Sequence, residues 1–199
     1  GGIIGYIYAY NRPITYSSHY TFTVGGSSSS GGALGGLSSL FNLGGGGMDA
    51  FTGDNVLELL KSPALMEKTL LSPVAYEGDT LSFMEYLLTC DSTRANCQKE
   101  KTKKETKNGV VSACDIFYPL GQERESFDRT QDSLLHEKTN DIISRCVTVL
   151  RRDKKLSFME YTFAFPDEQF AKRFSEAHLK AVSEFYVNTK TALARKNVE

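Results

Sequence analysis

The chain lacks several features that would point to a familiar class of protein. It has no tryptophan, only five prolines and a net charge of −1 over 199 residues. A charge this close to zero gives no electrostatic reason to expect a nucleic acid as a partner. The four cysteines show no CxxC pair and no zinc-ligand spacing: Cys90, Cys97, Cys114 and Cys146. An oxidising compartment could pair some of these cysteines, and the sequence leaves that open.

Motifs of catalysis and nucleotide binding are missing as well. The sequence contains no HExxH, no serine elbow and no GxGxxG spacing, and the Gly/Ser-rich stretch 25–47 has no lysine for a phosphate loop. The three histidines fall on different expected elements, and we expect His19 and His136 to be solvated. We therefore predict no catalytic, cofactor-binding or metal-binding residues, and a chain that is not itself an enzyme.

No apolar run reaches the roughly 20 residues that span a bilayer. The run at 1–10 nevertheless has the composition of the tail of a spanning helix. Small residues recur there at every fourth position, and three tyrosines follow where an interfacial aromatic belt would lie. We interpret 1–12 as the end of an N-terminal transmembrane helix, with an ordinary buried segment as the equal alternative.

The most informative stretch is 53–74, with the sequence GDNVLELLKSPALMEKTLLSPV. Asp54 suits an N-cap, and apolar residues then recur at helical spacing. Ser62 and Pro63 end this helix and start another, because proline is well tolerated at the first helical position. Two short amphipathic helices that meet at a corner are therefore predicted, and we expect them to form the packing centre of a small domain.

Other stretches predict strands and helices around that centre. Alternating residues predict a strand over 14–24, and the apolar stretch 80–88 is compatible with either a helix or a strand. A helix is expected over 127–145, with Leu134, Leu135, Ile142 and Ile143 facing inward. A hairpin is expected over 146–165, with Met159, Tyr161, Phe163 and Phe165 on one face of its second strand. Residues 91–108 are polar and lysine-rich, which indicates a solvated helix or loop.

From Asp167 the pattern is helical to the last residue. Asp167 suits the N-cap, and the predicted apolar stripe consists of Phe170, Phe174, Ala177, Ala181 and Phe185. After Tyr186 the sequence turns polar without a stop signal, which is typical of a helix that meets another helix in a coiled coil or an oligomer. Because the chain starts without methionine and ends inside this pattern, we expect a fragment of a longer protein.

These expectations combine into an α+β fold with three parts. Residues 1–12 form the end of a transmembrane helix, and 13–166 form the α+β domain, in which a small antiparallel or mixed sheet packs with helices. Residues 167–199 form the start of a long C-terminal helix.

In order and spacing, these pieces resemble the chain-length-determinant family, the Wzz-type polysaccharide co-polymerases, and in particular its Bacteroidetes branch. The resemblance rests on IIGYIYAYNRPITYSS, the Gly-rich stretch, the 53–74 stretch, FDRTQDSLL, DKKLSFMEYTFAFPDEQFAKRFSE and HLKAVSEFYVNTKTALARKNVE. Residues 89–118 show the least resemblance.

The resemblance implies two membrane helices around a periplasmic α+β domain, anchored in the bacterial inner membrane. It implies a ring-like homo-oligomer that sets the length of an O-antigen, capsular or exopolysaccharide chain during lipopolysaccharide or polysaccharide biosynthesis. The partners would be further copies of the chain, a membrane polymerase and the growing glycan. Two alternatives stay open: the periplasmic part of an exopolysaccharide tyrosine autokinase, and a periplasmic export adaptor.

Overall fold

The computed structural model describes residues 14–23, 53–90, 116–151 and 158–196. Its elements follow one another as β1 (Tyr16–Thr23), α3 (Gly53–Leu60), α4 (Pro63–Leu70), β2 (Pro73–Tyr76), β3 (Asp79–Ser82), α5 (Phe83–Cys90), η3 (Arg124–Ser126), α7 (Arg129–Asp141), η4 (Ile142–Cys146), β4 (Val147–Arg151), β5 (Phe158–Phe165) and α8 (Glu168–Lys196). The expected mixed α+β class is confirmed. The predicted transmembrane end at 1–12 and the Gly/Ser-rich stretch 25–47 lie outside the described residues.

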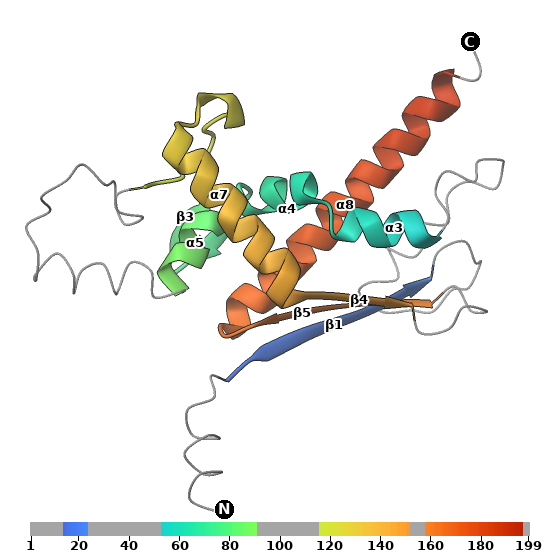
Figure 1. The fold of residues 1–199 in the computed structure, drawn as a ribbon, viewed down its shortest axis with the longest axis horizontal. Coiled ribbons are helices and arrows are strands. Elements are labelled where there is room, and N and C mark those ends of the chain that lie inside the picture. The colour runs from blue at the N-terminus through green and yellow to red at the C-terminus, as the bar shows by residue number, and fades with distance from the viewer. Residues whose placement is uncertain (1–13, 24–52, 91–115, 152–157, 197–199) are drawn as a thin grey trace, which may run out of the picture.

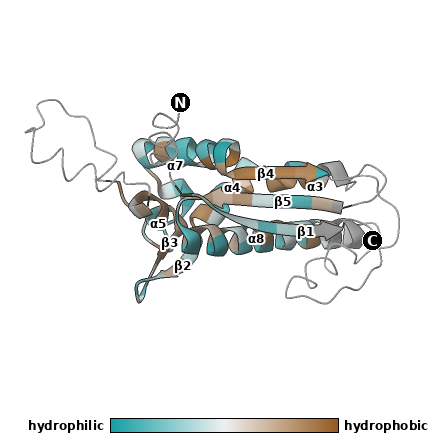
Figure 2. Ribbon diagram, turned by 90° about the horizontal axis from the view of Figure 1, so that it is seen from below, coloured by the Kyte–Doolittle hydropathy of each residue, from teal (hydrophilic) through white to brown (hydrophobic). Residues whose placement is uncertain are grey.

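Helices cover one face of a small antiparallel sheet, and no described helix or strand covers the other face (Figures 1 and 2). The strand order is β1-β5-β4, with β5 in the centre and antiparallel to both neighbours. Alternation along β5 sends every second side chain toward the helices, where Met159, Tyr161, Phe163 and Phe165 are buried. The predicted strands, and the predicted inner face of the second hairpin strand, are therefore confirmed.

The predicted corner of two short helices is also confirmed. α3 and α4 meet at Ser62–Pro63 and bury the same apolar positions that the pattern indicated: Val56, Leu60, Leu65, Met66 and Leu70. The capping details differ from the expectation. α3 already begins at Gly53, so Asp54 lies inside the helix, and Ser62 has the extended backbone of an N-cap without a side-chain cap bond. Pro63 alone shapes the start of α4.

A second hairpin, β2–β3, was not predicted. Pro73 does not simply end the helix region but opens β2, and Glu77 and Gly78 form the turn with φ values of 49° and 94°. Glycine tolerates such a conformation at no steric cost, so Gly78 is the signal that could have revealed this turn. The ambiguous stretch 80–88 contains both predicted types of structure, the end of β3 followed by α5.

The predicted helix over 127–145 is α7 together with the π-helical turn η4. Asp128 is its N-cap and forms a full capping box with Gln131, and Leu134, Leu135 and Ile142 are buried as expected. One boundary was wrong. Cys146 closes η4 instead of opening the strand, because the wider π-turn delays β4 until Val147.

The stripe predicted on the last helix was partly wrong. Phe170 and Phe174 are fully buried, but Ala177 and Ala181 are half-buried and Phe185 is 42% exposed. The buried ridge instead continues in steps of four, through His178, Val182 and Tyr186, all at most 2% exposed. Such i±4 rows are inclined to the helix axis and form one of the ridges by which helices pack.

Membrane-spanning geometry is absent from the described part of the chain, where no helix is both long enough and apolar enough to cross a bilayer.

Candidate functional site

The most distinctive feature of the molecule is the way α8 is held at one end and extends from the core at the other. Its first half packs on the sheet through stacked rings: Phe170 and Phe174 lie 5.3 Å apart at 8°, and Phe174 lies 4.9 Å from Phe163. Phe83 of α5 meets Phe174 edge-on at 5.3 Å. Offset and edge-to-face pairs of this kind add specific geometry to apolar burial, so they fix the direction of α8.

The start of α8 is fixed by Asp167, as the sequence predicted. One carboxylate oxygen accepts the backbone N–H of Phe170 at 2.6 Å and also the hydroxyl of Tyr86 at 2.9 Å. A single side chain thus caps α8 and ties it to α5. Burial and the nearby Asp167 carboxylate raise the pKa of Tyr86, so its hydroxyl stays a donor.

His178 joins α8 to the corner between α3 and α4. Its side chain is fully buried, with Nε2 3.1 Å from the carbonyl oxygen of Leu60 and Nδ1 3.2 Å from Oγ1 of Thr69. Because a carbonyl only accepts, Nε2 carries the proton, and Nδ1 faces the Thr69 hydroxyl, which itself donates to the Leu65 carbonyl at 2.8 Å. Burial lowers the pKa of His178 to about 4, which keeps the ring neutral near pH 7.

Sequence reasoning gave His178 no role. The available signal was its position four residues after Phe174, on the ridge that begins at Phe170. A histidine on an otherwise aromatic ridge of this kind is a core residue, and its contacts with Leu60 and Thr69 show that it serves packing.

The far half of α8 leaves the core. Tyr186 is the last side chain described as buried, and the helix then continues to Lys196, with Thr191 and Ala192 exposed (Figure 1). At a rise of about 1.5 Å per residue, the 29-residue helix is about 43 Å long. The predicted run of this helix beyond Tyr186 is therefore confirmed over the described residues.

The open face of the sheet carries a small polar cluster around His19. Its Nδ1 lies 3.0 Å from Oγ1 of Thr162 and 3.8 Å from a carboxylate oxygen of Glu160. A hydrolytic triad needs the acid and the nucleophile on opposite ring nitrogens, whereas both contacts here use Nδ1. The cluster is therefore a surface contact between β1 and β5, with His19 exposed as predicted.

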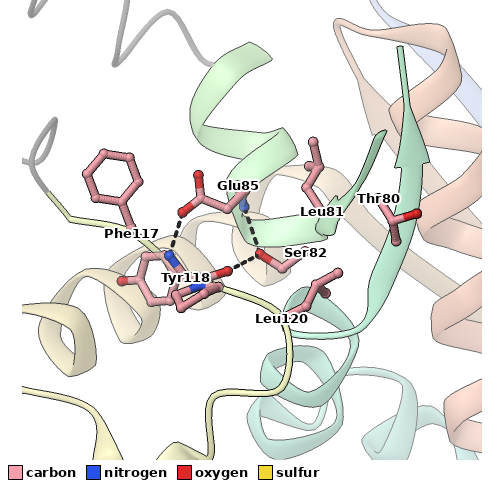
Figure 3. A pocket seen from close by; sticks show the side chains of 8 residues that line it. Thr80, Leu81, Ser82, Glu85, Phe117, Tyr118 and Leu120 are labelled. Carbon is pink, nitrogen blue, oxygen red and sulfur yellow. Dashed lines mark hydrogen bonds between the residues drawn. The ribbon is translucent and has the colours of Figure 1, made fainter. Parts of the chain in front are cut away.

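A pocket of about 230 Å³ lies between β3, α5 and the segment after 115 (Figure 3). Its polar groups bind one another: Glu85 accepts the backbone N–H of Tyr118, and the Ser82 hydroxyl donates to the Tyr118 carbonyl. The remaining lining is mostly apolar, with Phe117 and Leu120 exposed at its rim. This pocket suits an apolar side chain better than a polar substrate.

The other candidate residues are not brought together. His136 is exposed on α7, close to Glu67 and Asn140, and lies on a different element from His19 and His178. Cys90 and Cys146 are half-buried on α5 and η4, while the other two cysteines lie outside the described residues. No group of three potential metal ligands occurs among the residues that the structure describes.

Comparisons of the chain with protein-family models, curated proteins and solved structures found no match.

Proposed function

We propose that this chain is the main domain of a membrane-anchored, non-catalytic regulator of polysaccharide chain length. It works as a homo-oligomer beside a membrane polymerase, on the periplasmic side of the bacterial inner membrane, where O-antigen, capsular polysaccharide or exopolysaccharide is assembled. The observation that carries the proposal is α8, a helix of 29 residues that is anchored by an aromatic core and then extends beyond it.

The placement of the strand and helix starts supports this assignment. Tyr16 at the start of β1 pairs with Phe165 at the end of β5, and α8 starts three residues later, at Glu168. The first strand and the long helix therefore begin at the same end of the molecule. If residues 1–12 end a membrane helix, as the sequence predicts, this end would face the membrane and α8 would point away from it.

In the proposed mechanism the chain retains the glycan or the polymerase and does not itself make or break a bond. In a homo-oligomer, several copies of α8 side by side form an extended surface away from the membrane. That surface retains the growing glycan or keeps the polymerase in place, and the lifetime of the complex sets the chain length.

The test breaks α8 outside the domain core. Thr191 is exposed and its hydroxyl bonds only to the Val187 carbonyl of its own helix. A Thr191→Pro change removes a backbone N–H and kinks the helix at a cost of about 3 kcal/mol, whereas Thr191→Ala leaves it intact. A gel of the surface polysaccharide should show a shifted modal length with proline and an unchanged one with alanine. An unchanged distribution with proline, at equal protein level in the membrane, contradicts the proposal.

A further inference from the structure

The three-stranded sheet ends in two strands whose outer edges have no backbone partner among the described residues. β1 and β4 each pair with β5, and no other described segment bonds to their backbones. In antiparallel pairs, alternate residues turn their N–H and C=O groups outward, so each edge offers a row of donors and acceptors.

β1 lacks the features that normally protect such an edge. Its eight residues, YSSHYTFT, include no proline and no lysine, arginine, aspartate or glutamate. Natural sheet edges are usually short, charged, bulged or interrupted by proline, because an unprotected edge pairs with other chains. The sequence of β1 therefore carries no proline or charge that would hinder pairing with a further strand.

Apolar side chains gather along the same edges. Six large apolar side chains are exposed in the described residues, and three of them lie on or beside the outer strands: Ile14 at 73%, Tyr16 at 40% and Leu150 at 57%. A strand added to either edge would remove part of this surface from water, which is favourable.

The directions of the strands select the partner. Since β1 and β4 are both antiparallel to β5, they run parallel to each other. A second copy in the same orientation can therefore place its β4 along β1 as a parallel pair. A contact between two different edges is head-to-tail, and such contacts form a ring where the rotation between copies closes and an open filament where it does not. An unrelated peptide would cover one edge and leave the other open, whereas copies of this chain cover both.

We propose that β1 of one copy pairs with β4 of the next, so that the sheet continues from subunit to subunit. This inference rests on the proposed function, which requires a homo-oligomer, and it names the surface by which the copies assemble.

The test places charges on both edges. Ser17 and Thr148 are exposed, and their direct cross-strand partners Ala164 and Thr162 are uncharged. Glu160 lies two residues from Thr162 on the same face of the sheet, so the single variant Thr148→Lys controls for pairing inside one copy. Ser17→Lys combined with Thr148→Lys sets like charges across the proposed contact, while Ser17→Glu combined with Thr148→Lys sets opposite ones. Like charges should weaken each interface by about fivefold, and opposite charges should preserve it.

The measurement is native mass spectrometry of the full-length protein in detergent, for wild type and both double variants. We expect oligomers for wild type and for the Glu/Lys variant, and smaller species for the Lys/Lys variant. If both variants assemble like wild type, the edge pairing is overturned while the proposed function stands. If both variants lose assembly, pairing of β1 with β4 is also overturned. A monomeric wild type overturns this inference together with the proposed function.

Discussion

At the scale of single residues, His178 shows how one buried side chain couples the core to pH. Its ring stacks on Phe174 at 5° and lies 5.9 Å from the ring of Tyr161, while Leu60 and Thr69 supply its hydrogen-bond partners. Among the described residues, no carboxylate forms an ion pair with it. The neutral ring is therefore the form that the fold prefers, and burial is the reason for its low pKa.

This preference predicts an acid-dependent loss of stability. As the pH falls below 6.5, the unfolded chain binds a proton at His178, whereas the folded chain does so only near its pKa of about 4. The contribution of His178 is thus fully present above pH 6.5 and is lost toward pH 4, by about 3 kcal/mol in total.

The measurement is urea unfolding across this pH range for wild type, His178→Gln and His136→Gln. The first variant should lose part of the pH dependence, and the second should keep it, because His136 is exposed. Equal pH slopes for wild type and His178→Gln would show that the buried ring is not the sensor.

At the scale of elements, α7 depends on its first turn. The Asp128 carboxylate accepts hydrogen bonds from the backbone N–H groups of Thr130 and Gln131, both at 2.7 Å. In return, the side-chain oxygen of Gln131 accepts the backbone N–H of Asp128. Asp128→Ala should cost about 1 kcal/mol of the free energy of unfolding, while Asp128→Asn should cost much less, because asparagine caps equally well. Urea unfolding checks both variants, and equal losses would argue against the cap.

Elements with strong periodicity could be predicted from the sequence, and those set by tertiary contacts could not. The buried face of β5 follows from strict alternation, and the α3–α4 corner follows from Ser62 and Pro63. The predicted stripe on α8 failed after Phe174, because the pattern admits steps of three or four and only packing selects four. In the turn at Glu77–Gly78, a single glycine was the only sequence signal. The role of His178 could not be predicted, because it depends on Leu60 and Thr69, more than a hundred residues earlier.

At the scale of the whole molecule, one anchored helix adjoins one sheet whose outer edges have no backbone partner among the described residues. The aromatic core fixes where α8 leaves the domain, and β1 and β4 give each copy two edges that match in direction. Both features fit the assembly of several copies that we propose for a regulator of chain length.

The most direct test is to delete the gene in its host. The surface polysaccharide of the deletion strain is then compared on a gel with that of the complemented strain. We expect that polymer is still made without the protein, but with a broad length distribution in place of a preferred length. Restoring the wild-type gene should restore the preferred length. An unchanged distribution, or complete loss of the polymer, would contradict a role in setting chain length.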